Sequence, residues 1–106
     1  MPPEPPPVPD AACFWLIPAG VLVHFDQPLL PGDTWNVANW FVRWNNQEWP
    51  VTKVTTLGAQ VALDLGLAFL NLGADVVSYS PPPFDVTGLH DNPVEAFADY
   101  PLVPCV

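Results

Sequence analysis

The chain has 106 residues, half of them hydrophobic and only 12% charged, with a formal net charge of −9. A chain of this length forms one domain with room for a hydrophobic core, so a second domain is not expected. Arg43 and Lys53 are the only lysine or arginine residues, so we expect neither nucleic acid nor anionic membrane surfaces as partners, because both require clustered positive charge.

The N-terminal segment has six prolines and one charged residue within positions 2–9. It has neither the basic nor the apolar region of a secretory signal, and no later stretch is long and apolar enough for membrane insertion. Proline fixes φ and favours the extended polyproline II conformation. We therefore expect residues 1–11 to form an extended proline-rich arm and residues 12–106 to form the folded domain.

Short strands separated by turn-forming residues are the predominant pattern after the arm. In residues 60–65, Val61, Leu63 and Leu65 alternate with polar or small residues, which indicates a strand with one buried face. Comparable patterns predict six strands, over residues 20–26, 40–45, 51–56, 60–65, 75–80 and 94–100.

Proline, glycine, asparagine and aspartate mark turns between these strands, as in a β-sandwich. One alternative is a helix over residues 62–72, where leucines recur with helical spacing. Gly66 would destabilise that helix, so we expect a strand through Leu65 and at most one helical turn over residues 68–72. The predicted fold is a single antiparallel all-β sandwich with an extended N-terminal arm.

The two cysteines, Cys13 and Cys105, lie near opposite ends of the chain. A disulfide between them is geometrically possible if strands carrying both termini lie side by side, and it would close almost the whole chain into a loop. Their spacing fits neither a redox motif nor a zinc site. Without a secretory signal, we expect two reduced thiols rather than a disulfide.

Five tryptophans are more than one small core commonly holds, and charged residues are about half as frequent as in an average soluble domain. Two interpretations remain open: a tryptophan-rich core under a lightly charged surface, or a subunit whose apolar surface is covered by neighbours. We favour the second. Trp40 and Trp44 share one face of a predicted strand, so we expect one of them in the core. The residues expected at a protein interface are Pro5, Pro6, Pro7, Trp15, Trp35 and Trp49.

Residues that could carry chemistry show no catalytic pattern. His24 and His90 accompany no nucleophile motif, the acidic residues are scattered, and no glycine-rich phosphate loop is present. Loop oxygens could converge on calcium, but Asp and Asn in turns usually cap their own backbone. The candidate calcium ligands are Asp26, Asp85, Asp91 and Asn92. We expect no catalytic residue, no cofactor and no bound metal.

Four segments together resemble the SwmB-type domain, a bacterial Ig-like repeat. They are residues 25–29 (FDQPL), 61–65 (VALDL), 73–81 (GADVVSYSP) and 90–97 (HDNPVEAF), in the order that the family has them. The resemblance implies an Ig-like β-sandwich that serves as a non-catalytic module of surface, adhesive or virion proteins. One departure is Asp91, which stands where the family usually has glycine, so a ligand role for that loop does not follow from the resemblance.

These observations lead to two functional hypotheses. The first is a non-catalytic structural accessory subunit of a large assembly, such as a phage capsid decoration (cement) protein, located on the virion and assembled in the host cytoplasm. Its partners would be capsid or other assembly proteins, or further copies of the chain. The alternative is an adhesion module at the cell surface that binds carbohydrate or protein. Low surface charge, excess tryptophan and the arm favour the first hypothesis.

Overall fold

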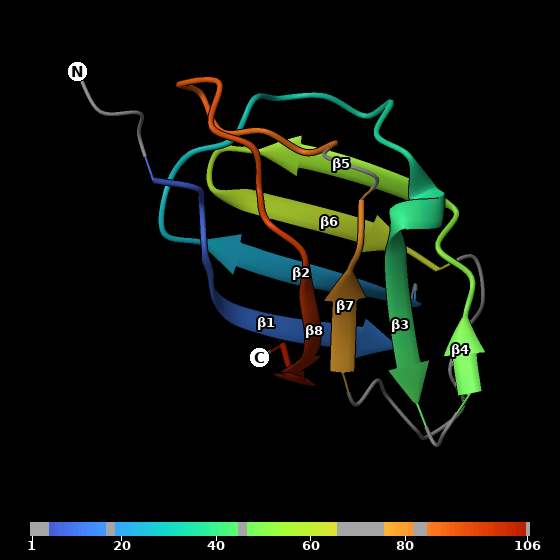
Figure 1. The fold of residues 1–106 in the computed structure, drawn as a ribbon. Helices are drawn as coiled ribbons and strands as arrows, with labels where there is room; N and C mark the ends of the chain where they lie inside the picture. Colours follow the sequence, from blue (N-terminus) through green and yellow to red (C-terminus); the bar gives the residue numbers. More distant parts are fainter. Residues whose placement is uncertain (1–4, 17–18, 45–46, 66–75, 82–84, 106) are drawn as a thin grey trace.

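The chain folds into two β-sheets that pack face to face (Figure 1). The computed structural model describes residues 5–16, 19–44, 47–65, 76–81 and 85–105, without the side chains of residues 15, 16, 19, 44 and 47. The larger sheet has the order β5-β6-β2-β1-β9. Its strands are β1 (Pro9–Leu16), β2 (Ala19–Phe25), β5 (Lys53–Leu57), β6 (Gln60–Asp64) and β9 (Val103–Pro104).

The smaller sheet has the order β4-β3-β7-β8. Its strands are β3 (Trp40–Trp44), β4 (Gln47–Trp49), β7 (Val76–Tyr79) and β8 (Phe97–Pro101), and the 3₁₀ turn η1 (Val37–Asn39) precedes β3. This is the strand order of an Ig-type sandwich, with β1, β2, β6 and β5 in the A, B, E and D places and β3, β7 and β8 in the C, F and G places. The predicted all-β sandwich is confirmed.

Two features of the architecture differ from the expectation. The pairing of β1 with β9 is parallel, whereas every other pair of strands in the described ranges is antiparallel. Strand β1 begins at Pro9, so residues 9–11, expected in the arm, belong to the sheet. The predicted helical turn over residues 68–72 lies outside the described residues.

The sequence predicts well the strands that show apolar alternation or a run of β-branched residues. Each of the first five predicted segments overlaps one strand, namely β2, β3, β5, β6 or β7, and the sixth overlaps β8, which begins three residues later than expected, at Phe97. Strands β1, β4 and β9 were not predicted. Residues 11–16 of β1 are uninterruptedly apolar and show no alternation, while β4 and β9 are too short for a periodic signal.

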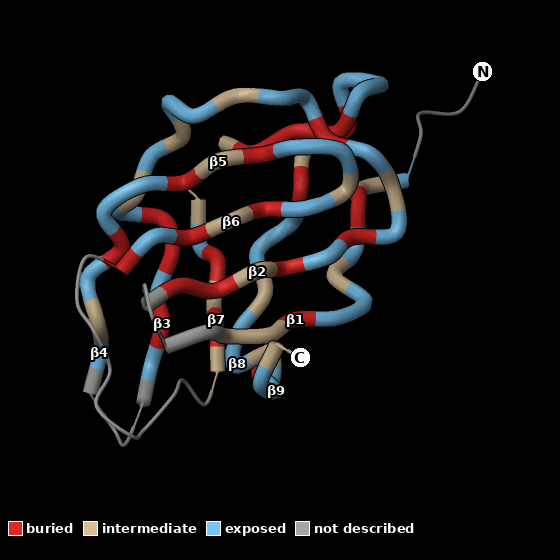
Figure 2. Tube along the Cα trace, turned by 180° about the vertical axis from the view of Figure 1, so that it is seen from behind, coloured by how far each residue is buried: buried red, intermediate tan, exposed pale blue. Residues whose placement is uncertain are grey.

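The core lies between the sheets, and the predicted inward faces are confirmed. Val21, Val23 and Phe25 of β2 are fully buried, as are Val61 and Leu63 of β6. Figure 2 shows the resulting alternation of buried and exposed positions along the strands. Trp40 of β3, one of the two tryptophans considered for the core, is also buried.

An aromatic cluster joins the two sheets. The rings of Trp40 and Tyr79 lie 4.5 Å apart between centroids, and Phe97 lies 6.0 Å from both. Phe25 of the larger sheet meets Phe97 edge to face at 6.4 Å. These separations are the ones that aromatic pairs favour, and such pairs add about 0.5–1.5 kcal/mol each beyond their burial.

The Tyr79 hydroxyl is the polar centre of this cluster. Its oxygen accepts hydrogen bonds from the backbone N–H groups of Val86, at 2.9 Å, and Asp85, at 3.2 Å. Burial of the side chain raises the pKa of Tyr79, because the phenolate form would lose its hydration. The hydroxyl therefore stays protonated and fixes the start of the segment that follows β7.

The expectation of two reduced thiols is wrong, because Cys13 and Cys105 form a disulfide. The parallel pairing of β1 with β9 places Cys13 beside Val103, and the Cys105 N–H donates to the Phe14 carbonyl at 2.8 Å. The bond joins residues 92 positions apart. Strands that carry both termini do lie side by side, as the disulfide alternative required; the inference of reduced thiols failed because it rested on the redox compartment and not on which strands pair.

Tyr79→Phe should abolish a component of alkaline unfolding. Since the pKa of Tyr79 is raised in the folded protein, the folded state keeps a proton that the unfolded chain loses, and the free energy of unfolding falls as pH rises above about 10. The variant should lack this slope and should lose about 1–3 kcal/mol at neutral pH, because the buried N–H of Val86 and the part-buried N–H of Asp85 lose their acceptor. Urea unfolding between about pH 8 and pH 11 measures both effects. Equal slopes in the two proteins would contradict the prediction.

Reduction of the disulfide should lower the free energy of unfolding substantially. In the chain-entropy model, opening a loop of 92 residues costs about 4–5 kcal/mol. Thermal unfolding with and without reductant gives the difference. The Cys13→Ser/Cys105→Ser variant should match the reduced protein and should not respond to reductant; a wild-type melting temperature unaffected by reductant would contradict the prediction.

Candidate protein-interaction site

One end of the sandwich collects three segments that are distant in sequence. They are residues 5–8 of the arm, residues 26–31 after β2, and residues 86–93 between β7 and β8, and we call this end the arm pole (Figures 1 and 2). Backbone hydrogen bonds connect the segments. The Asp26 N–H donates to the Val8 carbonyl at 3.0 Å, and the Leu30 N–H donates to the Thr87 carbonyl at 2.9 Å.

The loop over residues 86–93 is built around the buried side chain of Asn92. Backbone bonds from Val94 to Val86 and from Gly88 to Asn92 close the loop, and Asp91 adopts the left-handed conformation with φ of 60°. A Cβ atom on Gly88 would lie 2.3 Å from Asn92 Oδ1. Glycine is therefore required at position 88 for the Asn92 side chain to sit where it does.

The Asn92 amide holds the arm together with Gln27. Asn92 Nδ2 donates to the Pro5 carbonyl at 2.8 Å and to Gln27 Oε1 at 2.7 Å. Gln27 Nε2 in turn donates to the carbonyls of Pro5, at 3.0 Å, and Pro6, at 3.4 Å. The Pro5 carbonyl thus accepts two hydrogen bonds, which uses both of its lone pairs.

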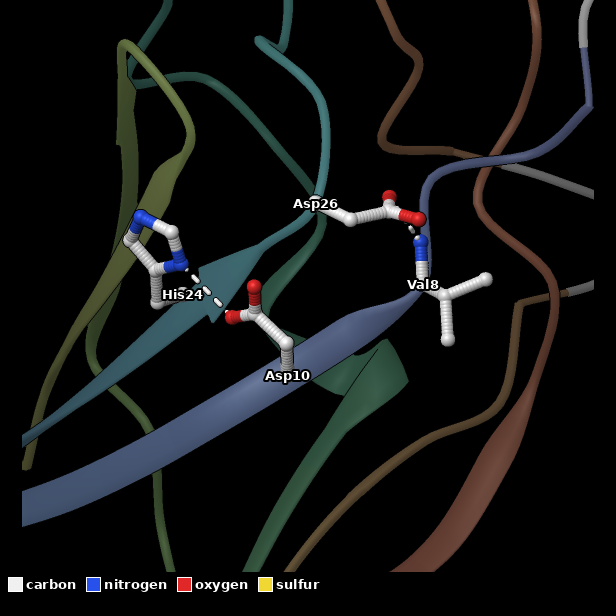
Figure 3. Close-up of polar contacts among 4 residues, drawn as sticks. All are labelled: Val8, Asp10, His24 and Asp26. Carbon is white, nitrogen blue, oxygen red and sulfur yellow. Dashed lines mark hydrogen bonds and ion pairs between the residues drawn. The ribbon is translucent and has the colours of Figure 1, made fainter.

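Asp26 completes what we call the arm clamp, formed by Asp26, Gln27 and Asn92. Prolines have no N–H, so Val8 is the first residue of the described arm that can donate, and its N–H reaches Asp26 Oδ1 at 2.9 Å (Figure 3). Pro7, between the two groups of hydrogen bonds, is buried. The arm is therefore docked on its own domain through carbonyls, one N–H and a buried ring.

A second polar contact lies next to the clamp, where β1 begins. His24 Nδ1 and Asp10 Oδ1 are 2.6 Å apart, and both side chains are about half exposed (Figure 3). The pair sits where the register between β1 and β2 shifts, between Pro9 and Ala11. Cys13, on the same small apolar pocket as His24, is bonded to Cys105 and so offers no thiol nucleophile. The contact between Asp10 and His24 joins the start of β1 to the end of β2.

The residues expected at a protein interface occupy different places. Pro5 is exposed, Pro6 half-buried and Pro7 buried, all at the arm pole. Trp35 is half-buried against the core and donates from Nε1 to Thr56 Oγ1 at 2.9 Å, and Trp49 packs against the core from β4. The side chain of Trp15 lies outside the described residues.

The candidate calcium ligands have other partners. Asp26 and Asn92 belong to the clamp, Asp85 Oδ2 accepts from the Asn36 N–H at 2.8 Å, and Asp91 forms the turn before Asn92. Within the described ranges, no three His, Cys, Asp or Glu side chains come close enough together to hold a metal ion. The sequence places Asn92 in a predicted turn and among the candidate ligands, but no signal in it indicates that Asn92 or Gln27 binds the arm, although both lie next to predicted strands.

Exposed apolar side chains gather at the arm pole. Among the described residues six large hydrophobic side chains are exposed, and three of them, Val8, Leu30 and Leu89, belong to this end. Pro5, Pro28 and Pro31 are exposed there as well. The pole therefore combines a fixed backbone with an apolar surface, as protein-binding surfaces do.

A groove of about 450 Å³ lies at the β4 edge of the smaller sheet, between η1, β3 and β4. Its aromatic lining comes from Trp40, Phe41 and Trp49, and Glu48 supplies a carboxylate. Trp40 is almost entirely covered, so the accessible aromatic surface belongs to Phe41 and Trp49. Such a lining could stack on a sugar ring or on a proline.

Comparisons with protein-family models, with curated proteins and with solved structures found no match. Over the ranges that the structure describes, no helix is both long enough and apolar enough to cross a membrane.

Asn92→Ala should release the arm and leave the sandwich folded. The substitution removes both hydrogen bonds of Nδ2, and the arm must lift before the Val8 N–H can exchange with solvent. We expect exchange of this N–H to accelerate about fivefold to tenfold, equivalent to roughly 1–1.4 kcal/mol. Hydrogen–deuterium exchange followed by NMR measures the rate.

Gly88→Ala tests the same clamp by a different route, because its Cβ would displace the Asn92 side chain. It should also accelerate exchange at Val8. Gln60→Ala, at an exposed position of β6, is the control and should leave the rate unchanged. If Val8 exchanged equally fast in wild type and in both clamp variants, the clamp would not hold the arm.

Proposed function

We propose that the chain is a non-catalytic structural accessory subunit that attaches to the surface of a large assembly, as a phage capsid decoration (cement) protein or another virion surface protein does. The observation that carries the proposal is the apolar arm pole. Val8, Leu30 and Leu89 are exposed around a docked polyproline segment, and large side chains on a rigid backbone bind a partner with little loss of conformational entropy.

The charge balance supports the same function. Eleven acidic residues against two basic ones make copies of the domain repel each other in solution. An apolar pole on a strongly acidic domain favours attachment through that pole with the remaining surface toward solvent. Outward-facing negative charge would also limit aggregation of the decorated particles.

The disulfide and the Ig-type topology support an exposed location. A disulfide that closes 92 residues is typical of proteins that work in oxidising surroundings, such as a released virion or a cell surface. The resemblance to SwmB-type domains adds an analogy with non-catalytic modules of such surfaces.

A second candidate function is an adhesion module that binds cell-surface carbohydrate or protein. The groove beside Phe41 and Trp49 is the observation that favours it. Under this alternative, saturating polysaccharide should shift the tryptophan emission, and Phe41→Ala should weaken the response, whereas substitutions at the arm pole should have no effect.

Recovery of the chain from its native source distinguishes the two functions. Wild type and Leu89→Asp would be produced there, particles would be separated by sedimentation, and mass spectrometry would measure the chain in each fraction. Wild type should sediment with a megadalton particle in stoichiometric amount. Leu89→Asp places a charge in the apolar contact and should lower its recovery about tenfold or more, equivalent to at least 1.4 kcal/mol.

Val103→Asp is the control, since Val103 is also an exposed apolar residue, 59% accessible, but lies on β9 beside Cys13 and outside the three segments of the arm pole. It should be recovered like wild type. Recovery of wild type only as a small soluble species would overturn the assembly function and favour the adhesion module.

A further inference from the structure

We infer that the arm clamp also binds residues 5–8 of a second copy of this chain, so that neighbouring subunits exchange arms. The inference deepens the proposed function and rests on it for the setting in which copies become neighbours. It assigns the clamp a ligand class, a polyproline segment, and a source for that segment, an identical chain.

The clamp can make the same hydrogen bonds whichever chain supplies the arm. Asn92 Nδ2 and Gln27 Nε2 bind carbonyl oxygens of Pro5 and Pro6, and Asp26 binds the Val8 N–H. All of these contacts run from side chains of the domain to the backbone of the arm. Exchange would keep every contact while changing its partner, which makes it a low-cost route to association.

A pivot for the arm lies where it joins β1. The β1–β2 register shifts between Pro9 and Ala11, so Asp10 lies at a bulge; on the arm side of this bulge Pro9 still pairs with Phe25, and the Asp26 N–H donates to the Val8 carbonyl. The contact between Asp10 and His24 holds this point, but both side chains are about half exposed. An exposed pair of this kind contributes roughly 0.2–1 kcal/mol, so turning the chain at this bulge costs that contact and the backbone pairing of Val8 and Pro9, which the β2 end of the second copy offers in turn.

The net charge opposes exchange between free copies, although the arm itself is uncharged. Each copy carries a net charge of −9, so close approach of two domains is opposed by repulsion. Residues 5–8 have no ionisable side chain. The arm therefore adds no charge to the contact, but because residues 5–8 run directly into Pro9 of β1, exchange brings the arm poles of two copies next to each other.

Effective concentration decides when exchange occurs. A short tether keeps the arm of the same chain near the clamp at an effective concentration of about 1 mM. In dilute solution the arm therefore docks on its own domain, as the structure has it. Exchange becomes competitive when an assembly holds neighbouring copies within reach of each other's arms.

Two full-length variants separate docking between chains from docking within one chain. Pro7→Asp places a charge at a buried position of the arm and disables the arm, whereas Gln27→Ala/Asn92→Ala disables the clamp. Neither variant can dock its own arm. When they are mixed, the intact arm of the clamp variant can enter the intact clamp of the arm variant.

The measurement is an NMR titration of ¹⁵N-labelled Pro7→Asp protein with the unlabelled clamp variant, up to about 1 mM. The side-chain amide signals of Asn92 and Gln27 should move to their wild-type positions in a saturable way, and sedimentation should detect a complex with twice the mass of one chain. Backbone amide spectra check that each variant is folded. Pro5→Gly/Pro7→Gly, which removes the rigid backbone without adding charge, gives a second arm variant.

The control titrant carries Pro7→Asp together with Gln27→Ala/Asn92→Ala. It should cause no shift of the Asn92 and Gln27 signals, because it has no arm that can dock. Unchanged Asn92 and Gln27 signals with the clamp variant would overturn arm exchange, whichever arm variant is used. That result would leave the particle-recovery experiment unaffected, since recovery depends on the exposed leucine at the pole and uses the wild-type arm. Failure of recovery, conversely, would not alter the shifts measured with purified protein.

Discussion

A segment of consecutive prolines offers a folded domain only carbonyl acceptors and ring surfaces, because proline has no N–H to donate. This constraint explains the arrangement of the arm pole. Two side-chain amides, Asn92 and Gln27, supply the missing donors, and the ring of Pro7 is buried between them and the first available N–H, that of Val8. A domain that holds such an arm must present side-chain amide donors to the proline carbonyls, and here the loop over residues 86–93 positions the amide of Asn92.

That loop depends in turn on the aromatic core. The Tyr79 hydroxyl accepts the N–H of Val86, and the Val86 carbonyl accepts the N–H of Val94, so the two ends of the loop are fixed to the strand that carries Tyr79. Tyr79 packs against Trp40 and Phe97. The position of the Asn92 amide is therefore set by rings that join both sheets, and loosening the core would loosen the clamp.

Whether the sequence predicts a feature of this structure depends on how far apart in the chain the interacting residues lie. Val61 and Leu63 reveal their strand because alternation is a local pattern. Asn92 and Pro5 are separated by 87 positions, and nothing in either segment indicates the other, because Asn in a turn ordinarily bonds to its own backbone. Cys13 and Cys105 meet only through the parallel pairing of β1 with β9. The fold class could therefore be predicted and the clamp could not, while the disulfide was one of two alternatives between which the local sequence does not decide.

The Cys13–Cys105 bond also determines how the domain carries mechanical load. If the arm is attached to one subunit while the C-terminal end is held elsewhere, tension enters the chain at Cys13 and leaves it at Cys105 through a covalent bond. The residues between these cysteines, which include the strands of both sheets after the start of β1, lie outside the path of the force. Pulling would extend only the segment before Cys13, so the sandwich would behave as an inextensible link when an assembly swells or is deformed.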